Sequence, residues 1–250
     1  MIAKTIDEVI ENLEQIIQTS KDEESTLGYF AALYQKVTIK IKDNLNTNYF
    51  ENDERMEKLD VIFANRYLSA YSDYKQGKKI SKSWEIAFNS SKDNSLIVLQ
   101  HLLLGMNAHI NLDLGIAAFK ITDKSTIDKL ESDFNKINEV LGSLIDDVQN
   151  DLAKIWPTLF RILKFFGKVD DFLVKFSMNI ARNGAWKFAN ELVNQEEKDK
   201  KEALISTKDM KTRELTKLII PSGIIEKIVF KIIRIGERGN ISDRIKALEK

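Results

Sequence analysis

Along most of the chain, apolar residues recur every three or four positions, which is the spacing of one face of an α-helix. The first stripe follows Thr5 and Glu8, a spacing that predicts a capping box at the start of a helix. Its members are Val9, Ile10, Leu13, Ile16 and Ile17. Asn52 and Ser81 stand at cap positions before two later stripes, and another helix is expected over about Ser25–Leu45. This pattern predicts a chain built from helices.

One stretch of the chain is apolar without any charge. The 19 residues from Asn94 to Leu112 include no Asp, Glu, Lys or Arg, which is long enough to suggest a membrane span of about 18 apolar residues. However, the polar side chains of Gln100, His101, Asn107, His109 and Asn111 all fall inside it. They would be costly in hydrocarbon, whereas neighbouring helices can pair them. We therefore expect residues 94–119 to form the buried central helix of a bundle.

The last third of the chain is less regular. A helix is expected to start at Pro157 and to end near Gly167. Residues of about 194–214 are highly charged and predict either an extension of the preceding helix or a mobile connector. Residues of about 221–236 combine many isoleucines with a narrow cationic stripe of Lys227, Lys231 and Arg234. This predicts a C-terminal helix docked on the bundle, with peripheral contact to a membrane surface as the alternative.

The composition supports an all-α fold and narrows the function. Only 2 prolines and 10 glycines occur in 250 residues, so turns are few, and residues 1–250 are expected to form a single helical domain. Lys plus Arg equals Asp plus Glu at 38 each, so no overall field favours nucleic acid as a partner. The absence of cysteine rules out disulfides and thiolate sites and predicts a cytoplasmic location. The N-terminus lacks the apolar stretch of a signal peptide.

The predicted central helix carries both histidines of the chain. At about 100° per residue, His101 and His109 share one broad face, with Asp113 one turn beyond His109. Gly105 and Ala108 leave space between the two imidazoles. That space could hold a metal, a water or a substrate, or it could let a neighbouring helix approach closely. Both histidines are candidates for general acid–base catalysis.

Two carboxylates from another helix could complete a metal site. Glu57 and Asp60 are three residues apart and so lie on one face of an otherwise apolar helix. Together with His101, His109 and Asp113 they would form a ligand set rich in oxygen that suits iron, manganese or zinc. The alternative is a buried polar network in which an arginine neutralises the carboxylates and the histidines donate to backbone carbonyls. The candidates for that arginine are Arg55, Arg66 and Arg182.

Three further polar residues are candidates for binding a substrate. Arg182 lies among apolar positions, where it needs an anionic partner, either a ligand or a carboxylate such as Asp60 or Asp113. Asn107 and Asn111 lie on the central helix beside His109. These residues suggest an enzyme that acts on a small apolar molecule. The alternatives are a non-catalytic protein that binds a lipid-like or isoprenoid ligand, and a structural interaction module. No phosphate loop, nucleophile elbow or HExxH motif is present.

Several phrases of the sequence resemble a known family. They are FAALYQKVT, RMEKLDVIFANRYLSAY, SWEIAF, VLQHLLLGMNAHINLDLGIA, DFNKIN and ARNGAW, in this order over about Leu27–Leu192. Together they resemble a family of bacterial proteins grouped as a domain of unknown function. GMNAHINLDL is the most specific phrase. The sequence does not depart from the family pattern at His101, Asn107, His109, Asn111 or Asp113, so the resemblance carries over to these positions. The resemblance implies an all-helical fold and supplies no reaction.

Overall fold

The computed structural model describes residues 2–143, 145–156, 178–220 and 223–249, and all regular elements within them are helical. The first four are α1 (Ile6–Asp22), α2 (Leu27–Asn44), α3 (Asp53–Lys75) and α4 (Lys82–Asn89), followed by the short 3-10 turn η1 (Ser90–Lys92). The centre is formed by α5 (Val98–Ala108), the π-helix η2 (His109–Asp113) and α6 (Leu114–Ile121). The rest are α7 (Ile127–Ser143), α8 (Ile145–Ile155), α11 (Met178–Asn194), α12 (Lys198–Ile219), α13 (Ile224–Gly236) and α14 (Ile241–Glu249). The predicted all-α fold is confirmed.

Local sequence signals set the starts of α1 and α3. The Thr5 hydroxyl accepts a hydrogen bond from the Glu8 amide at 3.2 Å, as the capping box predicts. The Glu8 carboxylate, however, accepts from the amide of Lys4 at 2.7 Å, one residue earlier than in the reciprocal box. The Asn52 side chain accepts from the Arg55 amide at 2.8 Å and so caps α3 as predicted.

The start of α4 is set by a residue far away in the chain. Ser81 stands at the cap position, but its side chain makes no capping bond. Instead, the carboxylate of Asp209 in α12 accepts from the backbone amides of Lys82 at 2.6 Å and Ser83 at 2.9 Å. The cap predicted for Ser81 was therefore wrong, because a carboxylate from another helix satisfies the same free amides more strongly than a serine hydroxyl.

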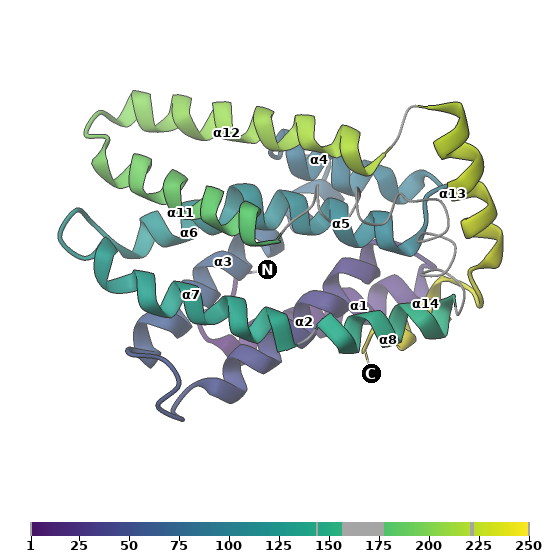
Figure 1. Ribbon diagram of the computed structural model, residues 1–250, viewed down its shortest axis with the longest axis horizontal. Helices are drawn as coiled ribbons and strands as arrows, with labels where there is room; N and C mark the ends of the chain where they lie inside the picture. Colours follow the sequence, from purple (N-terminus) through teal and green to yellow (C-terminus); the bar gives the residue numbers. More distant parts are fainter. Residues whose placement is uncertain (1, 144, 157–177, 221–222, 250) are drawn as a thin grey trace.

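The central helix lies along the middle of the molecule (Figure 1). Helices α2 and α4 pack against α5, α3 and α11 pack against α6, and α12 contacts α5 and η2. Val98–Ile121 is the one described helix long and apolar enough to cross a membrane, but 89% of its most apolar window is buried by the other helices. The prediction of a buried central helix is confirmed. It begins at Val98, four residues later than expected, because Gln100 and Glu237 accept the amides of Ile97 and Val98.

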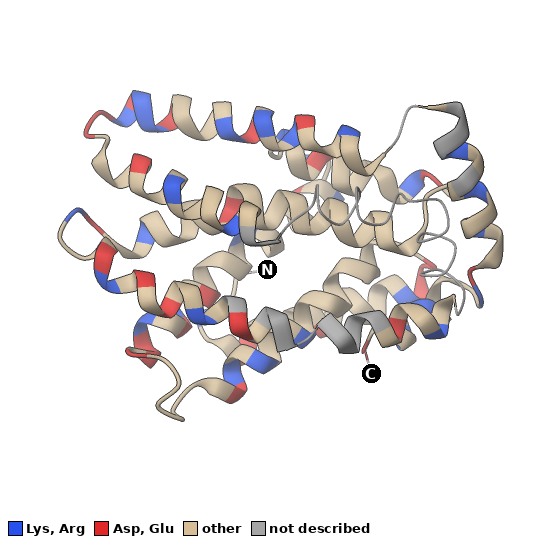
Figure 2. Ribbon diagram, in the orientation of Figure 1, with Lys and Arg blue, Asp and Glu red and all other residues tan. Residues whose placement is uncertain are grey.

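The highly charged segment predicted as a helix extension or connector forms a helix of its own. It makes up most of α12, whose charges lie along one edge of the molecule in Figure 2. Thr212, Thr216 and Ile219 of α12 are nevertheless buried, and they hold this helix against the bundle. Helix α13 then crosses the end of the molecule, and α14 returns to pack against α2 and α8. The helix predicted to start at Pro157 lies outside the described residues.

Candidate functional site

The centre of the bundle is interrupted by a π-helical turn that contains the two strongest candidates from the sequence. The amide of Leu114 donates to the carbonyl of His109, five residues earlier, so the turn is one residue wider than in an α-helix. His109 opens this turn and Asp113 closes it. Such insertions are rare and occur often at functional sites. The sequence predicted a regular helix here, so the π-helix is a feature that periodicity missed.

His109 and Asp113 form a buried pair. The Nδ1 atom of His109 lies 3.3 Å from the Oδ2 atom of Asp113, and both side chains are almost completely shielded from solvent. An ionised carboxylate can only accept hydrogen bonds, so Nδ1 must carry the proton of the neutral imidazole. The other ring nitrogen, Nε2, has no hydrogen-bond partner among the described residues. The pair therefore presents an oriented imidazole whose Nε2 lone pair is free.

Asp113 is held ionised by its neighbours. Its Oδ1 accepts from Arg66 Nε at 2.9 Å, and its Oδ2 accepts from Trp84 Nε1 at 2.8 Å. Burial alone would raise the pKa of Asp113, but Arg66, His109 and Trp84 outweigh it and keep that pKa below its ordinary value. Burial lowers the pKa of His109, against the opposing effect of Asp113. The predicted neutralisation of a carboxylate by an arginine is present here, with Arg66 as the arginine. His109, however, pairs with the Asp113 carboxylate and not with a backbone carbonyl as predicted.

Aromatic rings enclose the His109 imidazole. Phe63 stacks on it with ring centroids 3.6 Å apart and planes 7° apart. Tyr34 meets it edge-on at 4.5 Å, and Phe30 does so at 5.7 Å. Trp84 lies 6.0 Å away. These contacts fix the orientation of the ring and keep water from it, which favours the neutral form.

A second buried carboxylate, Asp60, lies on α3 one turn before Phe63. Neither of its oxygens has a hydrogen-bond partner among the described residues. Burial, together with the nearby charge of Glu57, raises the pKa of Asp60 to about 7. Glu57 itself accepts the Ile6 amide at 3.3 Å. Arg55 was also a candidate to neutralise these carboxylates, but it pairs with Asp133 at 2.7 Å.

Two buried tyrosines lie beside the His109 imidazole. The Tyr34 ring lies 6.0 Å from that of Tyr67, and both phenols are buried without a hydrogen bond from their hydroxyls. Burial raises the pKa of both, and the charges of Asp60 and Asp113 raise that of Tyr34 further. Tyr34 therefore lies within electrostatic range of both carboxylates. We call Tyr34, Asp60, Arg66, Tyr67, His109 and Asp113 together the His109 cluster.

His101 lies apart from the His109 cluster. The ring of Phe30 packs over Gly105, one turn after His101 and one turn before His109, and a Cβ atom on Gly105 would lie 2.5 Å from that ring. The space predicted between the imidazoles is thus filled by a neighbouring helix. His101 instead lines a small pocket with Tyr67 and Trp84, and its cavity volume of about 20 Å³ has room for one or two waters. Burial and the charge of Arg234 lower the pKa of His101 to about 4, although the charge of Asp93 acts in the opposite direction and raises it.

The five predicted metal ligands do not come together. Among the described residues, no three His, Asp or Glu side chains form a group that could hold a metal ion. His109 and Asp113 are paired, Glu57 and Asp60 are neighbours on α3, and His101 is separated from them by Phe30. Binding of iron, manganese or zinc by all five residues would require the central helix and α2 to rearrange. That ligand set stays a prediction.

The predicted substrate-binding residues are engaged within the protein. Asn107 donates to the carbonyl of Thr212 in α12 at 2.9 Å and accepts from Asn111 at 3.0 Å. The Arg182 guanidinium donates to the carbonyl of Phe134 and lies 4.9 Å from the centre of its ring. Burial lowers the pKa of Arg182 to about 10. The expected pairing of Arg182 with Asp60 or Asp113 was wrong, because neither carboxylate bonds to it.

Several residues of the site were not predicted from the sequence. Phe63, Tyr34 and Tyr67 have the ordinary spacing of core positions, which gives no sign that they enclose a histidine. Trp84 is a buried aromatic residue, and its indole N–H also donates to Asp113. One signal was present in the sequence. Phe63 follows the predicted ligand Asp60 by three residues and Tyr67 follows Phe63 by four, so all three lie on the same face of α3.

The comparisons with known proteins identify a family and no activity. No curated protein and no solved structure matches the chain. One family model does match, over residues 6–222, which include every element described above except α13 and α14. The predicted resemblance is confirmed over a longer range than the motifs covered. The chain belongs to the family of unknown function DUF5995.

Proposed function

We propose that this protein is an acid–base enzyme in which His109 takes a proton from a small, largely apolar molecule. The observation that carries the proposal is the buried Nε2 atom of His109, which has no partner while Nδ1 is held by Asp113. When Nε2 takes up a proton, the resulting imidazolium is stabilised by the Asp113 carboxylate beside it. Asp113 is thus a positioning residue and His109 the catalytic base.

The surroundings of His109 indicate the class of substrate. The imidazole is enclosed by aromatic side chains, which favour a planar or apolar molecule over a charged one. The free hydroxyls of Tyr34 and Tyr67 are the polar groups that could orient such a molecule. The pocket beside His101 shares Phe30, Tyr67 and Trp84 with the surroundings of His109, so a small rearrangement of these rings would connect the two.

The first test measures which nitrogen of His109 carries the proton. The chain has only two histidines, so isotopically labelled histidine gives two sets of signals in a long-range proton–nitrogen correlation spectrum, and the His101→Gln variant assigns them. We expect His109 to be neutral and protonated on Nδ1 at about pH 7. A proton on Nε2 at that pH would overturn the proposal, because the nitrogen could then accept none.

The second test measures proton removal directly. Nitrobenzisoxazole is a small planar molecule that opens to a coloured phenolate when a base removes its single reactive C–H proton. We expect the wild-type protein to accelerate this opening, and His109→Gln and Asp113→Asn to abolish most of the acceleration. His101→Gln is the matched control, because His101 is also buried and neutral but forms no hydrogen bond or ion pair with a carboxylate among the described residues. Equal rates for wild type and His109→Gln would contradict the proposal.

The other predicted functions are tested on the same preparation. Elemental analysis after native purification would reveal iron, manganese or zinc, and metal lost in both His109→Gln and Asp60→Asn would favour the metal-dependent enzyme. Native mass spectrometry would reveal a retained lipid-like or isoprenoid ligand, which would favour the binding protein. The cytoplasmic location stays a prediction that fractionation of cells would test.

A further inference from the structure

Helix α13 presents an unusual outer surface. The residues of α13 that the structure describes as exposed are three isoleucines and two lysines: Lys227, Ile228, Lys231, Ile232 and Ile235. The side chains of Ile228, Ile232 and Ile235 are 55%, 50% and 77% exposed, among the highest values for large apolar residues in the described chain. At positions i, i+4 and i+7 they form one continuous stripe. We call these five residues the α13 outer face.

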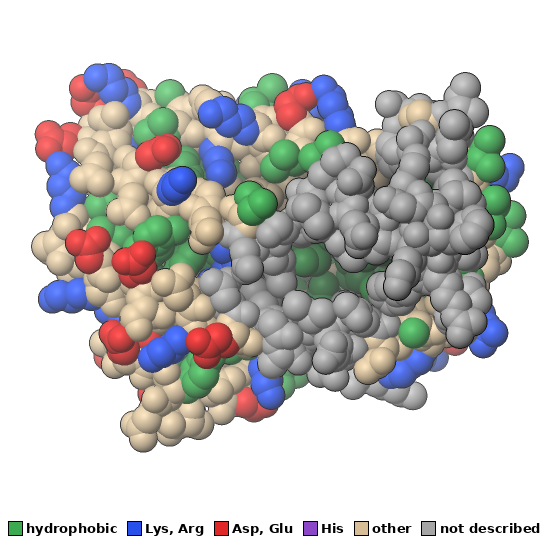
Figure 3. Space-filling view, viewed as in Figure 1, with side chains coloured by type: hydrophobic (Ala, Val, Ile, Leu, Met, Phe, Trp, Pro, Cys, Tyr) green, Lys and Arg blue, Asp and Glu red, His purple; other side chains and the backbone are tan. Residues whose placement is uncertain are grey.

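The opposite side of α13 is fixed to the protein. Ile233 is fully buried, and the backbone at Gly236 approaches the indole of Trp156 so closely that a Cβ atom there would lie 2.1 Å from its Nε1. Because the inner side of α13 is already packed against the protein, a rotation of the helix about its axis cannot bury the α13 outer face. Figure 3 shows the hydrophobic and cationic side chains on the right-hand edge of the molecule, over α13.

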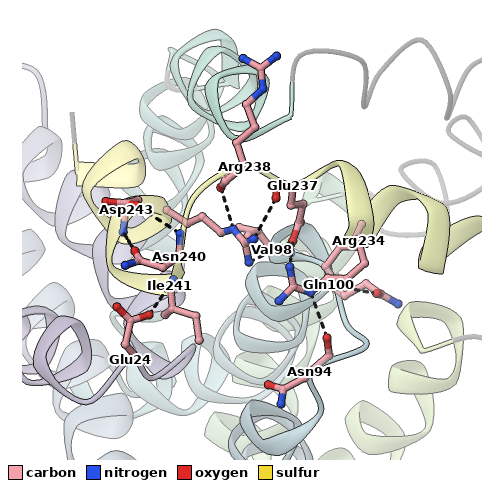
Figure 4. Close-up of polar contacts among 12 residues, drawn as sticks. Glu24, Asn94, Val98, Gln100, Arg234, Glu237, Arg238, Asn240, Ile241 and Asp243 are labelled. Atoms are coloured by element: carbon pink, nitrogen blue, oxygen red, sulfur yellow. Dashed lines mark hydrogen bonds and ion pairs between the residues drawn. The ribbon is translucent and has the colours of Figure 1, made fainter.

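The C-terminal end of α13 is also tied to the central helix and to α14 (Figure 4). Arg234 donates to the carbonyl of Asn94 at 3.0 Å, and Glu237 accepts the amide of Val98 at 2.7 Å. Arg244 of α14 donates to the carbonyls of Glu237 and Arg238, each at 3.1 Å. These bonds hold the α13 outer face in a fixed direction. The carboxylate of Glu237 is engaged by the Val98 amide and by Arg234 and Arg244, so it does not pair with the lysines of the α13 outer face.

We propose that the α13 outer face binds the surface of a membrane that contains anionic lipid. Three exposed isoleucines can enter the boundary between head groups and acyl chains, while lysine stems extend along them and keep their ammonium groups at the level of the phosphates. Neither Lys227 nor Lys231 forms an ion pair with a described residue. Their charges are therefore available to lipid phosphates, each contributing roughly a five-fold increase in affinity.

The same charges argue against a second copy of this chain as the occupant. In a two-fold dimer, identical surfaces meet, so the lysines of one α13 outer face would lie near those of the other. Like charges brought together in this way disfavour association. Anionic lipid has the complementary charge, and the apolar stripe suits the hydrocarbon beneath it.

The test is co-sedimentation of the full chain with vesicles of phosphatidylcholine alone and of phosphatidylcholine mixed with phosphatidylserine. We expect sedimentation with the anionic vesicles only, weakened by added salt. The pair Lys227→Gln with Lys231→Gln should weaken it roughly 25-fold. The pair Ile232→Gln with Ile235→Gln should abolish it. These positions are exposed, so the variants should keep the melting temperature of the wild type.

The matched control is the pair Ile39→Gln with Lys40→Gln on α2, where an exposed isoleucine also stands beside an exposed lysine. This pair should leave sedimentation unchanged. The proposal is overturned if wild type does not sediment with anionic vesicles, or if the control pair weakens sedimentation as much as the α13 pairs. It is also overturned if wild type forms a dimer that the isoleucine pair dissociates without any vesicle binding, since the surface would then join two copies.

Discussion

The His109 cluster has a buried carboxylate at each end, Asp113 at one and Asp60 at the other, and their pKa values are shifted in opposite directions. Asp113 and Asp60 are both buried within the bundle, and both act electrostatically on the phenol of Tyr34. Asp113 has an arginine, an indole and an imidazole as partners, and its pKa lies below the ordinary value. Asp60 has no hydrogen bond, and its pKa rises to about 7. Both carboxylates are buried, so the difference in their pKa values comes from their hydrogen-bond and ion-pair partners.

The two carboxylates therefore differ in their effect on stability: Asp113 is satisfied by its partners in the fold, whereas burial of the unpaired Asp60 is unfavourable. A buried carboxylate with charge-assisted bonds is costly to break but contributes little net stability, whereas an unpaired one is costly as it stands. Unpaired polar groups of this kind persist in proteins mainly where function requires them. The Asp60 end of the cluster is thus where a proton or a ligand is expected, and the Asp113 end is what holds His109 in position.

The largest effect is expected from removing the partnered carboxylate. Asp113→Ala leaves Arg66, Trp84 and His109 without their shared acceptor and creates a small cavity. We expect it to lower the free energy of unfolding by about 4–5 kcal/mol. Urea denaturation followed by circular dichroism measures this. The comparison is Asp60→Ala, which should lower it by less than half as much, and equal losses would mean that the two carboxylates do not differ.

How far the sequence could predict the fold depends on how local each cause is. The starts of α1 and α3 were predicted from Thr5 and Asn52, because their capping bonds lie within one turn. The start of α4 depends on Asp209 in another helix, and that of α5 depends partly on Glu237. Such contacts between distant residues leave no periodic trace in the sequence. The helices themselves were predicted because their apolar stripes are regular.

The same distinction holds for the candidate site. His109 and Asp113 stood out because an uncharged stretch predicts burial, and buried polar residues need a reason. The metal site they suggested depended on empty space beside Gly105, but a glycine equally permits the close approach of a ring, and Phe30 takes that place. Phe63 stacks on His109 because α3 packs against the central helix, and the π-helical turn lies where the two meet. Neither could be predicted from one segment alone.

The next largest effect concerns the pH dependence that Asp60 produces. Below about pH 4, Asp60 is protonated in both the folded and unfolded states, so its ionisation contributes nothing. Between about pH 4 and pH 7, the unfolded state releases the proton while the folded state, with a pKa of about 7, retains it. Stability therefore falls as the pH rises through this range, by up to about 4 kcal/mol, and levels off above it.

Asp60→Asn isolates this effect because asparagine has a similar shape and no ionisation. The free energy of unfolding of Asp60→Asn relative to wild type should rise steadily between about pH 4 and pH 7. Urea titrations at a series of pH values measure the difference, in which other titrating groups cancel. A difference independent of pH would show that Asp60 ionises as freely in the fold as in the unfolded chain, and that burial without partners does not raise its pKa.

The smallest effect tests whether the aromatic part of the cluster beside Trp84 is dry. Tyr67→Phe removes a buried hydroxyl that has no partner, so the free energy of unfolding should change by less than about 0.5 kcal/mol or increase slightly. Tyr49→Phe is the matched control, because the Tyr49 hydroxyl bonds to the Lys136 carbonyl at 3.1 Å and to Glu139 at 2.9 Å, and its removal should cost about 1 kcal/mol. A loss for Tyr67→Phe as large as that for Tyr49→Phe would mean that its hydroxyl is bonded to water or a ligand in solution. The hydrogen bonds of the cluster would then have two sources, protein groups at Asp113 and a mobile molecule at Tyr67.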